Sequence, residues 1–148
     1  MQIIVTTLVF ALMSMTGGFA EAVQNPPKTI LIEVNNQPLT VEYASTYEER
    51  NKGLMHRKTL CSDCGMLFNF QHSRYASMWM KNTYIPLDVA FIQSDGKILD
   101  IKPLSPHDLT PVGSSGEVHY ALEMNQGWFE KNNVKEGDKI RVIEQKKP

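Results

Sequence analysis

The sequence predicts a mainly β protein of the α+β class, in which one or two short helices accompany a compact barrel-like or strongly bent antiparallel sheet. Three observations support this fold class. Short segments rich in β-branched and aromatic residues recur along the chain, turn sequences such as Asp95-Gly96 separate them, and few segments show helical periodicity. Because 148 residues can bury one core but not two ordinary ones, we expect a single β-rich domain over residues 29–145.

The predicted strands begin after an extended leader at residues 23–28, whose two prolines exclude a helix. The segment TILIEVN, the turn NNQP and the segment LTVEYA predict a β-hairpin over residues 29–44. A second hairpin turn is predicted at Asp95-Gly96. The later predicted strands are residues 65–70, 75–82, 87–93, 97–104, 117–125 and 138–145, and residues 146–148 form a tail.

Two short helices are predicted among these strands. Thr46 and Glu49 have the spacing of a capping box, in which each side chain accepts a hydrogen bond from the backbone N–H of the other residue. We therefore expect a helix over residues 47–52, ended by Gly53. The second short helix is expected around residues 126–133.

The first 22 residues differ from the rest of the chain. They contain no Lys or Arg, they are apolar over residues 3–15, and they end in the small-x-small sequence AEA at residues 20–22. This pattern is typical of a secretory signal peptide, so we predict a periplasmic or secreted protein that begins near Glu21 or Val23 after cleavage. The apolar run is shorter than the ~20 residues of a spanning helix. The missing basic residue keeps an uncleaved membrane anchor as the alternative, and the membrane is otherwise not an expected partner.

The overall charge argues against a nucleic-acid partner. The chain has 15 basic and 16 acidic residues, a formal net charge of -1 at pH 7, and no long block of like charge. The common hydrolase, zinc-protease, P-loop and dinucleotide motifs are missing from the sequence. We therefore predict no cofactor and no nucleic-acid partner.

Polar residues interrupt segments that otherwise resemble a buried core. Lys81 follows SMWM, Asp88 lies between two apolar residues, and Glu123 lies within the segment YALEM. A buried charge costs several kcal/mol unless a partner compensates it, so we expect these side chains to compensate one another in one cluster. The predicted cluster consists of Arg57, Trp79, Lys81, Asn82, Asp88 and Glu123.

Three interpretations of this cluster remain open. It can be a polar network that fixes the strand register. It can line the groove of a non-enzymatic binding or accessory module, in which Trp79 stacks on an envelope glycan, peptide or protein. It can also form the site of an envelope hydrolase, with Asp88 and Glu123 as acid and base and with Lys81 or Arg57 stabilising the developing charge.

The two cysteines, Cys61 and Cys64, have C-x-x-C spacing. In an exported protein this spacing predicts a local disulfide, which stabilises the fold by only about 2 kcal/mol because the loop is short. The pair precedes a predicted strand, whereas a thioredoxin-like redox pair lies between a strand and a helix, so we favour a structural bridge over a redox centre.

Two metal sites are alternatives that we do not favour. Met78 and Met80 lie on one face of a predicted strand and could hold Cu(I), although scattered methionines more often fill a core. A Cys2His2 zinc site could be drawn from His56, Cys61, Cys64 and His72, but its spacing departs from the usual pattern. We therefore predict no metal.

Six segments together resemble one known protein family. They are EERNKGLMHRKTL, GMLFNF, WMKNTYIPLDVAFI, DGKI, YALEMNQGWF and VKEGDKI, and with them the chain resembles the small exported or membrane-associated proteins called domain of unknown function 192. The resemblance runs from about Ile32 to Val142. It implies a single β-barrel-like domain with short helices, often behind a signal peptide, and it implies no established activity. The Cys61/Cys64 pair lies outside the motifs. The motif positions fall on Arg50, Gly53, Leu54, Met55, Arg57, Gly65, Met66, Leu67, Phe68, Trp79, Met80, Lys81, Asn82, Thr83, Pro86, Leu87, Asp88, Gly96, Leu122, Glu123 and Gly127.

Overall fold

The computed structural model describes residues 26–143, so the predicted signal peptide, the first half of the predicted leader, the last two residues of the predicted domain and the tail lie outside the described residues. Within this range the chain is mainly β, as predicted, with nine strands and two short helices. In chain order these are β1 (Thr29–Val34), β2 (Gln37–Ala44), α1 (Tyr47–Lys52), β3 (Gly65–Arg74), β4 (Ser77–Met78), β5 (Leu87–Ile92), β6 (Ile98–Leu104), β7 (Val112–Gly113), β8 (Val118–Asn125), α2 (Trp128–Lys131) and β9 (Ile140–Ile143).

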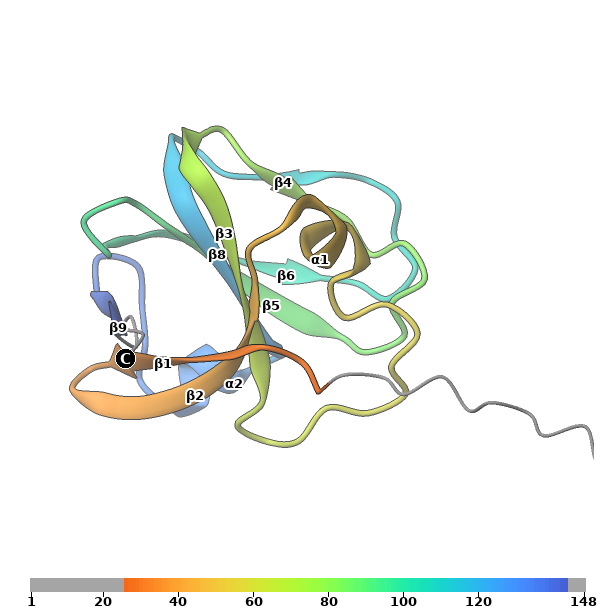
Figure 1. The fold of residues 1–148 in the computed structure, drawn as a ribbon, viewed down its shortest axis with the longest axis horizontal. Helices are drawn as coiled ribbons and strands as arrows, with labels where there is room; N and C mark the ends of the chain where they lie inside the picture. Colours follow the sequence, from red (N-terminus) through yellow and green to blue (C-terminus); the bar gives the residue numbers. More distant parts are fainter. Residues whose placement is uncertain (1–25, 144–148) are drawn as a thin grey trace, which may run out of the picture.

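Seven of these strands form one strongly curled sheet in the order β6-β5-β8-β3-β2-β1-β9 (Figure 1). The turn between β5 and β6 reaches β9, where the Ile140 N–H donates to the Gly96 carbonyl at 2.9 Å and the Ile98 N–H donates to the Asp138 carbonyl at 2.8 Å. The two ends of the sheet therefore approach each other, and the sheet forms a half-barrel. The predicted bent sheet is confirmed, and β4 and β7 pair separately.

One pair of neighbouring strands departs from the antiparallel arrangement. β2 and β3 run parallel, with Tyr43 opposite Leu67, whereas the other neighbours in the sheet are antiparallel. A parallel pair needs a connection that carries the chain back along the sheet, and α1 with the loop after it supplies that connection. This crossover places α1 beside the face of the sheet, and residues of α1 line the candidate site described below.

Apolar side chains pack on both faces of the sheet, because successive residues of a strand point to opposite faces. We call the first cluster the barrel core; its buried members include Ile32, Leu67, Leu122, Met124 and Phe129. We call the second cluster the outer core; its buried members include Leu54, Phe68, Met80, Val89 and Phe91. The residue that precedes Met124 on β8, Glu123, therefore faces the outer core.

The predicted helix over residues 47–52 is confirmed together with its capping box. The Glu49 N–H donates to Thr46 Oγ1 at 3.1 Å, and the Thr46 N–H donates to Glu49 Oε2 at 2.8 Å. The hydrogen bonds that its carboxylate accepts from the backbone N–H groups of Thr46 and Ser45 hold the pKa of Glu49 below its usual range. The second helix is shorter than predicted, Trp128–Lys131. No helix in residues 26–143 has the length and apolar character needed to cross a membrane.

The predicted strand over residues 75–82 is mostly wrong. Only Ser77–Met78 is a strand, and it pairs with β7, which the sequence did not predict. The chain then turns at Lys81 and Asn82, where the Thr83 N–H donates to the Met80 carbonyl at 3.2 Å and Asn82 has a φ of 51°. Asn adopts this left-handed conformation more readily than most residues. The turn removes both polar residues from the face of the sheet.

Candidate functional site

A cleft of about 260 Å³ opens beside the outer core. Its lining residues come from α1 and residues 53–55, from residues 76–79, from β3 and β8, and from Thr83. Thr83 and Glu123 line the cleft although both are almost completely buried, with 5% and 4% of their surface exposed. These two residues therefore form its inner end.

Glu123 is a buried carboxyl group without a hydrogen-bond partner among residues 26–143. Its strand neighbours across the sheet are Met66 on β3 and Val89 on β5, which offer no hydrogen bond. Among the described residues none donates to its carboxyl, and burial alone raises its pKa to about 8. No fully buried side-chain oxygen or nitrogen in residues 26–143 lacks a hydrogen bond, so the carboxyl of Glu123 is reached from the cleft. Glu123 is consequently protonated at neutral pH and can donate a hydrogen bond into the cleft.

Three cationic side chains line the same cleft. Arg50 and Lys52 come from α1, and Arg74 comes from the end of β3. Arg50 is partly buried, and its Nη1 donates to the carbonyls of Ser45 at 2.7 Å and Asn69 at 3.0 Å. None of the three cations forms an ion pair with a described residue. The cleft therefore carries positive charge that no acidic side chain of residues 26–143 neutralises through an ion pair.

Trp79 forms an exposed aromatic wall of the cleft, as its predicted stacking role requires. About 49% of its surface is exposed, and the ammonium of Lys81 lies 5.3 Å from the ring centroid. Thr83, at the inner end, donates from Oγ1 to the Lys81 carbonyl at 3.1 Å. The turn at residues 81–83 thus positions both the indole and a buried hydroxyl oxygen that can still accept a hydrogen bond.

The remaining predicted cluster residues do not join this site. Arg57 forms a bidentate ion pair with Glu42 of β2, with Nη2 2.6 Å from Oε2. Lys81 and Asn82 lie in the exposed turn, where the Asn82 carbonyl accepts from the His56 N–H at 2.8 Å. The expectation that Arg57 and Lys81 compensate the buried carboxylates is therefore wrong, because each interacts with another residue.

Asp88 and Glu123 lie on opposite faces of the sheet. Asp88 is paired with Met124 of the barrel core, whereas Glu123 is paired with Val89 of the outer core. The Asp88 carboxylate accepts from the Gly127 N–H at 2.7 Å and lines a different cavity beside α2. The two carboxyl groups cannot act on the same bond, so the prediction of an Asp88/Glu123 acid and base pair is wrong.

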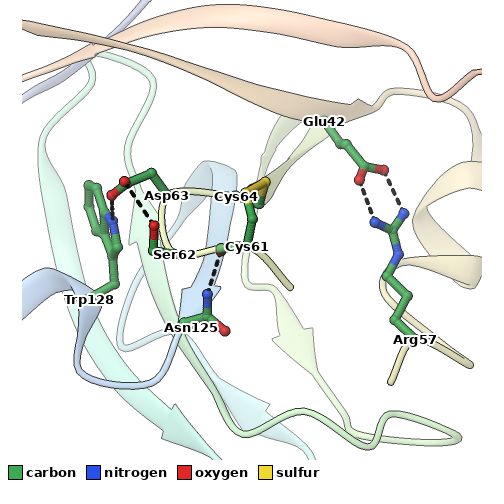
Figure 2. The surroundings of a disulfide bond; sticks show 8 residues. All are labelled: Glu42, Arg57, Cys61, Ser62, Asp63, Cys64, Asn125 and Trp128. Atoms are coloured by element: carbon green, nitrogen blue, oxygen red, sulfur yellow. Dashed lines mark hydrogen bonds and ion pairs between the residues drawn. A yellow bond between two sulfur atoms is a disulfide. The ribbon is translucent and has the colours of Figure 1, made fainter. Parts of the chain in front are cut away.

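The predicted disulfide between Cys61 and Cys64 is present and is tied to neighbouring elements (Figure 2). Asn125 Nδ2 donates to the Cys61 carbonyl at 2.7 Å, and Trp128 Nε1 donates to Asp63 Oδ1 at 3.0 Å. The bond from Trp128 lowers the pKa of Asp63 below its usual range. These contacts fasten the loop before β3 to β8 and α2, which fits a structural bridge.

Neither metal alternative gains support from the arrangement of the side chains. Both cysteine sulfurs are joined to each other, and within residues 26–143 no three His, Cys, Asp or Glu side chains converge as a metal site. The zinc alternative is therefore wrong. Met80 is buried in the outer core and Met78 is partly buried against the same cluster, so both thioethers occupy packing positions.

Sequence reasoning missed three residues that shape the cleft: Arg50, Arg74 and Thr83. Arg50 and Thr83 belong to the segments that resemble the family, so a signal existed for them. Arg74 lies at the end of β3, four residues beyond the end of the predicted strand, and no sequence pattern around it indicates a role.

The family assignment rests on a match over most of the chain. The family model for domain of unknown function 192, described as "Uncharacterized ACR", matches residues 30–142. The chain belongs to this family. A search of curated proteins found no match.

The solved structures that are similar to this chain include the following two. One is a "putative transcription regulator" from Sinorhizobium meliloti 1021, with 39% identity, a TM-score of 0.71, and coverage of 77% of this chain and 92% of that one. The other is a protein of unknown function from Novosphingobium aromaticivorans DSM 12444, with 33% identity, a TM-score of 0.69, and coverage of 76% and 83%. This member of the domain of unknown function 192 family therefore shares its fold with proteins whose described roles do not define a ligand.

Proposed function

We propose that this protein is a non-enzymatic binding module of the cell envelope and that the cleft at Glu123 is its binding site. One observation carries the proposal: the buried carboxyl group of Glu123 has no partner in the described part of the chain and lines a cleft. An unsatisfied buried polar group costs about 1–3 kcal/mol, so a fold that retains one at a cleft is arranged to offer it to a ligand. Strongly shifted pKa values also gather at functional sites.

The composition of the cleft favours binding over catalysis. Its lining holds aromatic and thioether side chains, three cations and one carboxyl group, and it contains no His, no Cys and no second carboxyl among the described residues. A nucleophile with an adjacent base, or a pair of carboxyl groups, is the usual minimum for hydrolytic chemistry. The volume of about 260 Å³ suits a ligand the size of a single sugar or a short peptide end.

The cleft also coincides with the family motifs. Several of the motif positions named above line it, and among them are Arg50, Trp79, Thr83 and Glu123. The cavity beside α2 includes only two motif positions, Asp88 and Gly127. We do not extend the transcription-regulator description of the similar structure to this chain. The acidic and basic residues of this chain are nearly equal in number, and it has no long basic stretch that would bind nucleic acid.

The envelope location rests on the predicted signal peptide and on the disulfide, which persists in oxidising compartments. When the full chain is expressed in a bacterium with a Sec system, we expect the protein in the periplasmic fraction. Its intact mass should correspond to a start near Glu21 or Val23 and to oxidised cysteines. A full-length mass in the cytoplasmic fraction, with two free thiols, would contradict this location.

Ligand binding is tested through Trp79, whose indole forms a wall of the cleft. In a Trp128→Phe background Trp79 is the only tryptophan, so its emission and the melting temperature can be followed against a panel of sugars, sugar acids, amino acids and short peptides. We expect at least one compound to shift both readouts, and we expect Trp79→Ala in the native background to remove the shift in melting temperature.

Tyr84→Ala is the matched control for Trp79→Ala, because both aromatic residues are 49% exposed and only Trp79 lines the cleft. The Tyr84→Ala variant should respond to ligand like the parent. A response that survives Trp79→Ala and is lost in Asp88→Asn would move the site to the cavity beside α2 and contradict the proposal.

A further inference from the structure

Cationic side chains outnumber acidic ones in the lining of the cleft, and this imbalance indicates the charge of the ligand. Arg50, Lys52 and Arg74 line it, and Glu123 is the only acidic residue in its described lining. Glu123 has no charge at neutral pH, because burial keeps it protonated. The cleft therefore presents up to three positive charges and no negative charge, and it favours an anion over a cation.

Arg50 is held in a fixed position for such an anion. Its Nη1 is occupied by the carbonyls of Ser45 and Asn69. The hydrogens on Nε and Nη2 have no acceptor among residues 26–143, and no carboxylate in that range pairs with the guanidinium. A guanidinium fixed in this way loses little side-chain freedom when it binds, and its geometry suits a planar carboxylate.

The walls between the cation and the inner end are apolar or aromatic. Phe68, Phe70 and Trp79 contribute rings, and Met55 and Met78 contribute thioethers. Such walls pack against a ring or an apolar body, whereas a bare inorganic anion would leave them uncovered.

Building on the proposed binding function, we infer that the ligand is a small organic acid: its carboxylate binds Arg50, its ring or apolar body packs on Trp79, and an oxygen at its inner end accepts a hydrogen bond from the Glu123 carboxyl. Sugar acids and the acid ends of aromatic amino-acid derivatives share this chemistry. The two sources differ in the polarity of the body that contacts the aromatic walls.

The protonation of Glu123 makes binding of an acid depend on pH. The charged groups on the surrounding elements are Arg50 and Lys52 on α1 and Arg74 on β3; its neighbours on β3 and β5 are apolar. Above a pH of about 8 the Glu123 carboxyl ionises, stops donating and repels the ligand. If only the protonated form binds, the affinity should fall about tenfold per pH unit beyond that point.

Three probes test the inference, each with a phenyl ring on a two-carbon side chain but with different charge: phenylacetate, phenylacetamide and phenethylamine. Binding is measured by Trp79 emission in the Trp128→Phe background at pH 6.5. We expect phenylacetate to bind at least about tenfold more tightly than the amide, and the amine to bind most weakly, because the fixed cations distinguish the three. Galacturonate against its methyl ester repeats the comparison with a sugar body and identifies which source the walls prefer.

Variants assign the selectivity to named groups. Lys52→Gln with Arg74→Gln removes two exposed cations of the cleft and should weaken phenylacetate binding several-fold, whereas Lys58→Gln with Lys97→Gln, which are exposed outside the cleft, should not. Glu123→Gln keeps a hydrogen-bond donor, so it should bind galacturonate, which has hydroxyl oxygens besides its carboxylate, at pH 6.5 and lose the pH dependence above pH 8.

The outcomes separate this inference from the proposed function. Binding of the amide or the ester as tight as that of the acid, or tighter binding of the amine, overturns the acid preference but leaves a binding cleft. No binding of any acid probe at millimolar concentration also overturns the inference. If the wider panel also causes no shift at Trp79, the proposed binding function fails with it.

Discussion

Raising the pH from 6 to 8 is expected to destabilise the parent protein by about 2 kcal/mol through Glu123 alone. In the unfolded chain this carboxyl has its ordinary pKa of 4.5, whereas burial raises the folded value to about 8. Between these values the folded state holds a proton that the unfolded state has released. Stability is therefore fully present below the unfolded pKa and decreases as the pH rises towards the folded pKa.

The Glu123→Gln variant should remove this dependence, because an amide of nearly the same shape does not titrate. Urea unfolding at pH 6, 7, 8 and 9 gives the free energy of unfolding for both proteins. We expect the variant to become the more stable protein at pH 9. Glu117→Gln, which changes an exposed carboxylate outside the cleft, is the control and should retain the pH dependence of the parent. Parallel profiles for the parent and Glu123→Gln would show that Glu123 is solvated or paired in solution.

Replacing Arg50 by Ala is expected to destabilise the fold by roughly 2–4 kcal/mol, since two hydrogen bonds from a charged donor are lost and their acceptors are left without a partner. The guanidinium joins the carbonyls of Ser45, just before α1, and Asn69, on β3. It therefore fastens the crossover helix to the sheet and keeps that wall of the cleft in place. Thermal unfolding and urea unfolding at pH 6.5 measure the loss.

Lys52→Ala is the matched control for Arg50→Ala, because Lys52 lies on the same helix, carries the same charge and is exposed. Its effect should stay within about 0.5 kcal/mol of zero. Equal losses for the two variants would mean that helical charge, and not the two carbonyl contacts of Arg50, stabilises α1.

Local chemistry made much of the fold predictable. The capping box between Thr46 and Glu49 sets where α1 begins, and its contacts span only four residues. The sequence alone was therefore sufficient to predict the start of this helix. Strand alternation also placed Glu123 correctly in a buried strand, opposite the face of Leu122 and Met124. The same alternation puts Asp88 and Val89 on opposite faces of their strand. Which of these two residues shares a face with Glu123 depends on the register between β5 and β8, and the sequence leaves that register open.

The prediction of one polar cluster was wrong for the residues whose partners come from distant parts of the chain. Glu42 reaches Arg57 from β2, whose parallel pairing with β3 no local pattern indicates. Asp88 is satisfied by a backbone N–H of Gly127, which residue identity does not reveal. Lys81 resembled a strand residue because apolar residues precede it, yet β4 ends at Met78, Trp79 is exposed in the cleft, and only Met80 is buried in the outer core before the turn.

The central claim is that Glu123 is an unpaired, protonated carboxyl at the inner end of a cleft. The most direct test is a carbon-13 NMR titration of the side-chain carboxyl groups of glutamate in the folded parent and in Glu123→Gln. We predict one glutamate resonance that titrates near pH 8 and is absent from the spectrum of the variant. If all glutamate carboxyls of the parent titrate within the ordinary acidic range, the carboxyl of Glu123 is ionised at neutral pH and the account of the cleft is contradicted.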